Sequence, residues 1–205
     1  MKQIFTMDVE KNINSGVKFA KILSKHNIKG EFYICGYLVE LYPKKCRKMA
    51  KNHIIGGHGY FHENFAKLSY KKQKKLIKKT KNVFEENKIK MRGWRFPFLS
   101  FKNESLKILA NLKIFDSSIN KAVLKKWGRF IFVRNWVKNL MNGNFCLPLK
   151  YPNNLEERPW DVIDLDTKNF FKRNGRIIIH CYNFQKYENE IKNYLKKLKS
   201  KRRLN

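Results

Sequence analysis

The stretch HIIGGHGYFHENF, His53 to Phe65, runs from a short apolar segment through a glycine pair to two histidines four residues apart. The apolar segment has the length of a buried strand, and the glycines mark its end. His58 and His62 therefore follow directly on a predicted strand. In parallel α/β proteins the catalytic groups gather at such strand ends, so this stretch predicts both the fold class and the edge of the sheet where a site belongs.

On both sides of this stretch, short apolar runs alternate with helical patterns. We expect strands at residues 3–9 (QIFTMDV), 31–39 (EFYICGYLV), 53–58, 115–119 (FDSSI) and 175–182 (GRIIIHCY). Helical patterns fill the intervals, and lysine-rich ones follow Ser69 and end the chain. This alternation predicts a parallel sheet or barrel with helices outside. Residues 121–167 combine turn residues with aromatics, and there we expect loops and short strands over one end of the barrel.

The chain has 205 residues, 42% of them hydrophobic, which indicates one folded domain over residues 1–205 rather than a disordered chain. A basic helix near residues 187–205 ends this domain. No secretory signal precedes the first predicted strand, and no apolar run is long enough to span a bilayer. Four cysteines without a C-x-x-C pair argue against a zinc–thiolate site and against a disulfide framework. We therefore expect reduced thiols and a location in the cytoplasm or at the inner membrane face.

The formal net charge of +30 predicts attraction to polyanions. Much of the charge lies on two helical segments, YKKQKKLIKKTKNVF at residues 70–84 and IKNYLKKLKSKRRLN at residues 191–205. Each segment keeps an apolar stripe, which is typical of a helix that docks on a core and turns its lysines to water. Two interpretations stay open, a lysine-rich bias on outer helix faces or a functional basic surface. The chain shows no zinc-finger spacing and no stacking platform of a nucleic-acid binder.

Polar residues also stand at the other predicted strands, namely Asp8, Glu10, Asp116 and His180, and Arg95 lies in the segment after the first lysine-rich helix. We expect the two histidines on one helical turn, because imidazoles at positions i and i+4 face the same side of a helix. One divalent ion can then bind both imidazoles and a carboxylate, which leaves an open position at the ion. A second carboxylate as base and an imidazole as acid complete a centre that hydrolyses amides.

Several of these segments carry a family resemblance. FTMDVE, HNIKGEFYICG, GGHGYFHENFAKLS, RGWRFPF, FDSSI and IIIHCYNF resemble, in order and approximate spacing, the motifs of the polysaccharide deacetylase family, also known as the NodB-homology or carbohydrate esterase family 4 domain. The resemblance covers nearly the whole chain and is specific in combination, although each motif alone is weak. It implies a distorted (β/α) barrel of about seven strands, similar to a TIM barrel, and metal-dependent removal of N- or O-acetyl groups from sugars.

The resemblance also implies roles for individual residues. His58 and His62 match the metal-binding histidines of the family. Arg95 matches the arginine that orients the catalytic carboxyl group, and His180 matches the histidine that acts as general acid. Asp8 matches the first acid of the first motif, which is the catalytic base.

The first motif departs from the commonest pattern of the family. That pattern has adjacent aspartates, and the second of them binds the metal, whereas this chain has Val9 there. Glu10 is the nearest substitute, so we expect Asp8 as base and Glu10 as third ligand, with an exchange of these two roles left open. Alternation along a strand points both carboxylates to the same face and Val9 to the other.

Simpler interpretations exist for three of the site residues. Asp116 matches the acid of the fourth motif, but a carboxylate before two serines can equally cap a turn or hydrogen-bond to those serines. Arg95 beside a proline can be a surface residue. His180 on an apolar strand can be a core histidine whose hydrogen bonds are satisfied.

The function expected from this sequence is a metal-dependent hydrolase that takes an acetyl group from an N-acetylated sugar or glycan. It would hold one divalent ion, with zinc as the default and cobalt, nickel or iron fitting the same ligands. A phosphate-bearing or lipid-linked substrate would suit the basic helices, which could also contact an anionic membrane. The alternatives are a degenerate domain that binds a glycan or polyanion without turnover, and a related hydrolase acting on a non-sugar amide.

Overall fold

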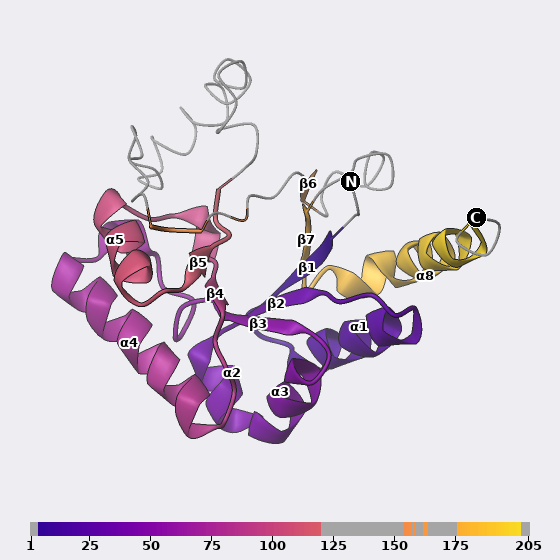
Figure 1. Cartoon of the computed structure of the whole chain (residues 1–205), viewed down its shortest axis with the longest axis horizontal. Coiled ribbons are helices and arrows are strands. Elements are labelled where there is room, and N and C mark those ends of the chain that lie inside the picture. The colour runs from indigo at the N-terminus through magenta and orange to yellow at the C-terminus, as the bar shows by residue number, and fades with distance from the viewer. Residues whose placement is uncertain (1–3, 120–153, 157, 159–161, 164–175, 202–205) are drawn as a thin grey trace, which may run out of the picture.

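The computed structural model describes residues 4–119, 154–156, 158, 162–163 and 176–201. Its strands are all parallel and form one curled sheet in the order β5-β4-β3-β2-β1-β7-β6 (Figure 1). They are β1 Ile4–Val9, β2 Glu31–Ile34, β3 Ile54–Gly57, β4 Gly93–Trp94, β5 Phe115–Asp116, β6 Val162–Ile163 and β7 Arg176–His180. The expected barrel-like α/β fold with about seven strands is confirmed.

The helices lie on the outside of this sheet, with α4 and α5 at one end of the molecule and α1 and α8 at the other (Figure 1). They are α1 Ile13–Lys25, α2 Gly36–Leu41, α3 Pro43–Ala50, α4 Tyr70–Glu86, α5 Asn103–Asn111 and α8 Phe184–Lys201, with short 3-10 turns at Phe65–Lys67 and Pro97–Leu99. The helices cover the outer face of the sheet, and its curl encloses the inner face. All residues of β2, and those of β1 after Ile4, are therefore buried.

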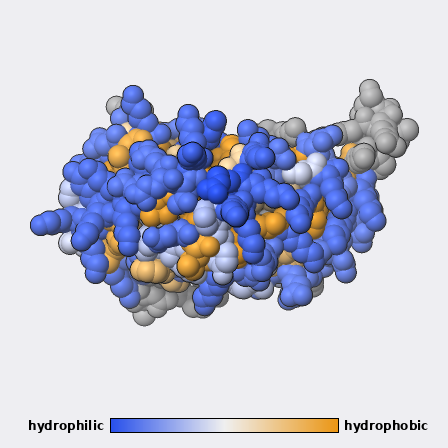
Figure 2. Space-filling view, turned by 90° about the horizontal axis from the view of Figure 1, so that it is seen from below, coloured by the Kyte–Doolittle hydropathy of each residue, from blue (hydrophilic) through white to orange (hydrophobic). Residues whose placement is uncertain are grey.

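The two lysine-rich helices dock as their apolar stripes predict. On α4, Ile77, Val83 and Phe84 are buried while most of the lysines face water, and on α8 the buried residues include Ile191 and Leu195. Figure 2 shows the lower face of the molecule largely covered by hydrophilic residues. Within the described part of the chain, no helix is long and apolar enough to cross a membrane.

The prediction of one strand over residues 31–39 is wrong in its second half. The strand ends at Ile34, and Gly36 begins helix α2. Gly36 packs so closely on Tyr60 that a Cβ atom there would lie 2.7 Å from the Tyr60 ring. A short apolar run does not distinguish a buried strand from a buried helix. The boundary between β2 and α2 therefore became visible only with the tertiary structure, in which Gly36 packs on the distant Tyr60.

Residues 154–156 and 158 lie against the side of β5 that faces away from β4. The backbone N–H of Asp116 donates to Glu156 at 2.9 Å, and the backbone N–H of Arg158 donates to the carbonyl of Asp116 at 2.7 Å. The Arg158 side chain reaches inward to the Glu31 carboxylate at 3.3 Å. Most of the loops and short strands expected over residues 121–167 fall outside the described residues.

Candidate metal centre

The carboxyl ends of the strands surround a cavity of about 250 Å³. Its described lining consists of Asp8, Glu10, His58, His62, Phe96, Phe98, Leu99, Ile178, His180 and Tyr182. Five of the seven residues that the sequence singles out for the site are therefore brought together here. The parallel register explains part of this convergence, because Asp8 on β1 pairs directly with His180 on β7.

His58 and His62 lie on a loop after β3 and not on the helical turn that their spacing predicts. Gly59, which directly follows His58, has a φ of +74°, and His62 itself has a φ of +68°. Both residues therefore adopt a left-handed backbone conformation, which no continuous α-helix contains. Such a backbone is unfavourable for a residue with a Cβ atom and is typical of functional sites. The ring centroids of the two histidines are nevertheless only 4.9 Å apart.

The surroundings of His58 show that its Nδ1 atom carries a proton. Its Nδ1 lies 2.8 Å from the carbonyl oxygen of Arg95, and a carbonyl can only accept, so Nδ1 carries the proton. The other nitrogen, Nε2, is buried without a hydrogen-bond partner among the described residues. It faces carboxylate oxygens of Asp8 at 3.9 Å and Glu10 at 3.8 Å. A buried ring nitrogen that faces two carboxylates at these distances marks a place where a cation fits between them.

The donor set fits a divalent ion. One nitrogen of each histidine and one oxygen of Glu10 all lie within 4.8 Å of one another. Two ligands bound at about 2.1 Å with a tetrahedral angle are about 3.4 Å apart. The His62 Nε2 to Glu10 Oε1 distance is 3.4 Å, and the His58 Nε2 to Glu10 Oε1 distance is 3.8 Å. The hydrogen bond from His58 Nδ1 to a backbone carbonyl is also the usual outer support of a metal-binding imidazole.

Glu10 is held in its ionised form. Burial alone would raise the pKa of Glu10, but the neighbouring imidazoles of His58 and His62 outweigh burial and hold that pKa well below its usual value. The Tyr37 hydroxyl donates to the backbone carbonyl of Glu10 at 2.6 Å, which fixes the chain after β1. Val9 between the two acids is fully buried on the helix side, against Gly16 of α1.

Asp8 is bound to a fully buried arginine. Arg95 Nη1 donates to Asp8 Oδ1 at 2.6 Å and to the Thr6 hydroxyl at 2.9 Å. The rest of the guanidinium donates to the carbonyl and the hydroxyl of Ser117, each at 2.9 Å. Arg95 has no exposed surface, so the interpretation as a surface arginine is wrong. Because Asp8 Oδ1 is occupied by Arg95, Glu10 is the carboxylate better placed to bind an ion together with both histidines.

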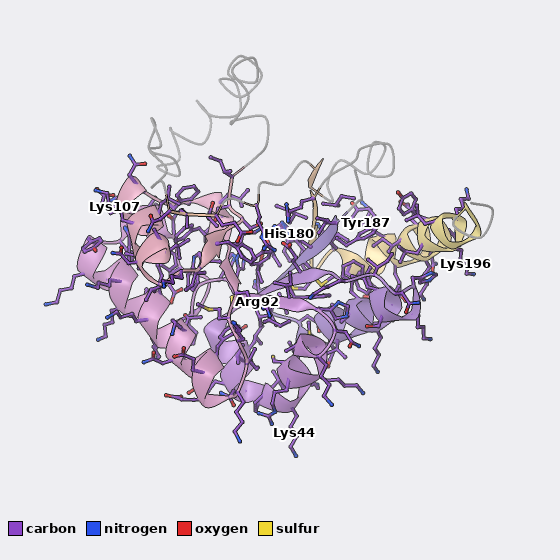
Figure 3. All side chains as sticks on the ribbon, viewed as in Figure 1. Lys44, Arg92, Lys107, His180, Tyr187 and Lys196 are labelled. Carbon is purple, nitrogen blue, oxygen red and sulfur yellow. The ribbon has the colours of Figure 1, made fainter. Side chains whose placement is uncertain are left out.

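His180 ends β7 and lines the cavity, with its ring stacked on Tyr182 at a centroid distance of 5.2 Å and an interplanar angle of 14°. Figure 3 shows His180 near the middle of the molecule, where the strands meet, whereas Lys44, Lys107 and Lys196 lie at its periphery. His180 is partly exposed as a residue, while its Nδ1 atom is buried. His180 is therefore accessible from the cavity, unlike a core histidine.

Asp116 does not belong to the described lining of the cavity. Its carboxylate is buried and accepts hydrogen bonds from the hydroxyl of Ser118 at 2.7 Å and from the backbone N–H of Ser118 at 3.2 Å. The Ser118 hydroxyl in turn accepts from the backbone N–H of Phe96 at 2.9 Å. The hydrogen bonds to Ser118, which were one of the two interpretations, do form, and they support the loop that carries Arg95. The match of Asp116 to the acid of the fourth motif stays a prediction.

Sequence reasoning missed the aromatic residues around the cavity. Phe98 packs edge-on against the His62 ring at 4.4 Å, and both Phe98 and Leu99 have positive φ angles. Phe98 and Tyr182 expose more than half of their surface. Phe98 stands three residues after Arg95, and Tyr182 stands two residues after His180. This closeness to a predicted site residue is the sign in the sequence that they lie beside the cavity.

Comparison with known sequences points to one family. The sequence model described as "Polysaccharide deacetylase" matches residues 7–114, which is just over half of the chain. A peptidoglycan-N-acetylglucosamine deacetylase of Bacillus cereus is 30% identical over 79 residues, which make up 38% of this chain and 29% of that protein. The chain thus matches less than a third of the length of that relative.

Solved structures with the same fold resemble this chain at low identity. A CE4 family pseudoenzyme from Bacillus anthracis has a TM-score of 0.64 at 17% identity, over 98% of this chain and 61% of that one. A family 4 carbohydrate esterase from Streptomyces lividans, solved in complex with acetate, has a TM-score of 0.59 at 11% identity, over 88% of this chain and 78% of that one. At these identities the likeness shows the fold alone.

Proposed function

This chain belongs to the polysaccharide deacetylase family, and from that premise we propose that it is a metal-dependent hydrolase that removes the acetyl group from an N-acetylated sugar. The observation that carries the proposal is the set Glu10, His58 and His62, whose ligand atoms converge around a buried imidazole nitrogen that has no other partner among the described residues. Asp8 and His180 line the same cavity and supply the base and the acid that amide hydrolysis needs.

In this proposal Glu10, His58 and His62 hold one divalent ion, with zinc as the default for these ligands. When bound, such an ion polarises a carbonyl and lowers the pKa of water. Asp8 takes the proton of the attacking water, and Arg95 holds the Asp8 carboxylate in a fixed orientation. His180 gives a proton to the departing amine, so that acetate and a free amino sugar are released.

The rim of the cavity suits a sugar ring. Phe98 and Tyr182 present exposed aromatic faces beside the ligands, and carbohydrate rings bury their apolar faces on such surfaces. We propose an N-acetylated glycan, of which the B. cereus relative's peptidoglycan is one example, as the substrate class. The exposed lysines of α4 could add attraction to a phosphate-bearing or lipid-linked form of such a glycan.

The first test is the metal content of the purified chain after metal loading and buffer exchange. We expect about one divalent ion per chain by elemental analysis, and loss of that ion in a His58→Ala, His62→Ala double variant that still folds. His26→Ala, which removes an imidazole from the end of α1, is the matched control and should keep the ion. A chelator should stop acetate release from N-acetylglucosamine oligomers, and added metal should restore it. Equal retention in the parent and the double variant, or none in the parent, would refute the centre.

One observation favours a second candidate, a domain that binds a glycan or polyanion without turnover. Val9 stands where the common family pattern has a metal-binding aspartate, and here it is buried in the core. Binding of acetylated oligomers without any release of acetate, with the metal present, would support this candidate. An affinity that falls steeply with added salt would identify the ligand as a polyanion.

A further inference from the structure

A column of buried polar side chains lies beneath the metal centre, inside the curled sheet. The register of β1 and β2 pairs Asp8 with Tyr33 and Thr6 with Glu31, so these four side chains share the inner face in two layers. Tyr33 has no exposed surface and Glu31 has 3%. Polar groups this deep in a sheet are kept only where they are fully bonded.

The Arg95 guanidinium lies over the Tyr33 ring. The central carbon of the guanidinium is 4.1 Å from the ring centroid, while the edge of the guanidinium donates to Asp8, Thr6 and Ser117. The hydrogen bonds hold the edge of the guanidinium and resist tilting through their N–H···O angles. The ring packed against the group adds to that restraint, and the cation–π attraction is strongest in a dry site such as this one.

Tyr33 itself is held in place by the carboxylate of Glu31. Its hydroxyl donates to Glu31 Oε2 at 2.8 Å, and burial together with the Glu31 charge raises the pKa of Tyr33 well above its usual value, so the hydroxyl remains a donor. The Glu31 carboxylate is neutralised by Arg158 at 3.3 Å and by Arg176 at 3.3 Å. Arg158 comes from the segment beside β5, so this contact ties that segment to the inner face of β2.

The neighbouring strand makes room for the Tyr33 ring. Gly56 on β3 pairs with Tyr33, and a Cβ atom at Gly56 would lie 2.7 Å from the Tyr33 ring and 2.7 Å from the carbonyl oxygen of Gly93. The first glycine of the pair in the HIIGGH stretch is therefore required where this ring lies.

We infer that Tyr33 is a positioning residue for the deacetylation reaction, holding the Arg95 guanidinium in the plane from which it bonds the Asp8 carboxylate. The inference rests on the proposed function, because it gives Asp8 the role of base. Tyr33 touches neither the cavity nor the three metal-binding side chains among the described contacts. Its contact with Arg95 is the link to the Asp8 carboxylate on which the inference rests.

Three variants separate this role from ordinary packing. Tyr33→Phe keeps the ring and loses only the hydroxyl. Tyr33→Leu loses the ring. Phe32→Leu is the matched control, since Phe32 is the adjacent, equally buried aromatic residue on the other face of β2, packed on Phe19 and His53.

The kinetic measurement is the deacetylation rate of the metal-loaded protein. We expect Tyr33→Leu to lower kcat about tenfold or more with a nearly unchanged KM, because the interaction it removes acts on the reacting carboxylate and not on substrate binding. Tyr33→Phe, which keeps the ring, should retain most of the wild-type kcat. Phe32→Leu should lose stability but retain kcat. Equal losses of kcat in Tyr33→Leu and Phe32→Leu would overturn the inference.

A second measurement decides the question without turnover. In ¹⁵N-labelled protein, the Nε–H signal of Arg95 is identified by its loss in Arg95→Lys, and its hydrogen exchange reports whether the guanidinium stays bonded. We expect fast exchange in Tyr33→Leu and slow exchange in the wild type, Tyr33→Phe and Phe32→Leu. If the wild type hydrolyses no acetylated sugar, the proposed function fails, and slow exchange in Tyr33→Leu would separately overturn the positioning role.

Discussion

Arg95→Met tests whether the buried ion pair is the centre of the site. Arg95 makes four described hydrogen bonds, of which the bond to Asp8 is the shortest at 2.6 Å. The variant leaves the Asp8 carboxylate, 3% exposed, without its strongest partner. Removing one partner of a buried ion pair costs about 3–5 kcal/mol of stability, because the remaining charge is desolvated and uncompensated.

The matching variant, Asp8→Asn, leaves the Arg95 charge buried with only neutral partners and should also be destabilising. The double variant Asp8→Asn, Arg95→Met carries no uncompensated charge. We therefore expect its free energy of unfolding to exceed the value from adding the two single effects by about 1.5 kcal/mol or more.

The assay is urea unfolding of all four proteins with a chelator present, so that metal binding does not contribute. The slope of the unfolding free energy against urea concentration should be the same for each protein if their folds are preserved. Additivity to within about 0.5 kcal/mol would show that Asp8 and Arg95 are not coupled. That result would refute the argument that Arg95 orients the base.

Two further predictions concern the sheet. Gly56→Ala should lower the free energy of unfolding by about 1–3 kcal/mol, because the new methyl group meets the Gly93 carbonyl and the Tyr33 ring. Urea unfolding measures this change. A variant as stable as the wild type would show that the neighbouring strands shift at little cost and would contradict the prediction. Burial lowers the pKa of His53, whose Nδ1 accepts from the Gly30 N–H at 3.1 Å. Below about pH 6.5 the unfolded chain takes up a proton that the folded chain resists, so stability should fall as the pH falls, and His53→Gln should flatten this dependence. An unchanged pH profile in that variant would contradict the account.

Arg95 connects the two halves of the proposed chemistry. Its side chain holds Asp8, and its backbone carbonyl accepts from the Nδ1 of His58. The proposed ligand and the proposed base are therefore both held by Arg95, which follows β4 and is bonded to Ser117, just after β5. Small errors in ligand geometry are costly for a metal centre, and a shared support of this kind reduces them.

The alternating hydrophobic pattern of the sequence, together with the positions of the predicted strand ends, was sufficient to locate much of the candidate site. Asp8, Glu10, His58, His62 and His180 all line one cavity, as expected from their positions after predicted strands. The carboxyl ends of parallel strands meet at one edge of a sheet, so a local pattern in each strand is enough to bring distant residues together. The same alternation separates the two acids from Val9, which faces the core.

The sequence by itself therefore determined the parallel α/β fold, the edge of the sheet that carries polar groups, and the residues that stand there. Only the tertiary structure decided that residues after Ile34 form a helix, that the histidine pair lies on a loop, that Asp116 bonds Ser118, and that Tyr33 lies under Arg95. These outcomes depend on contacts between residues far apart in the chain, such as Gly36 with Tyr60 and Asp8 with Arg95. A local pattern of hydrophobicity records which face of an element is buried, but it does not record which side chain will be packed against that face.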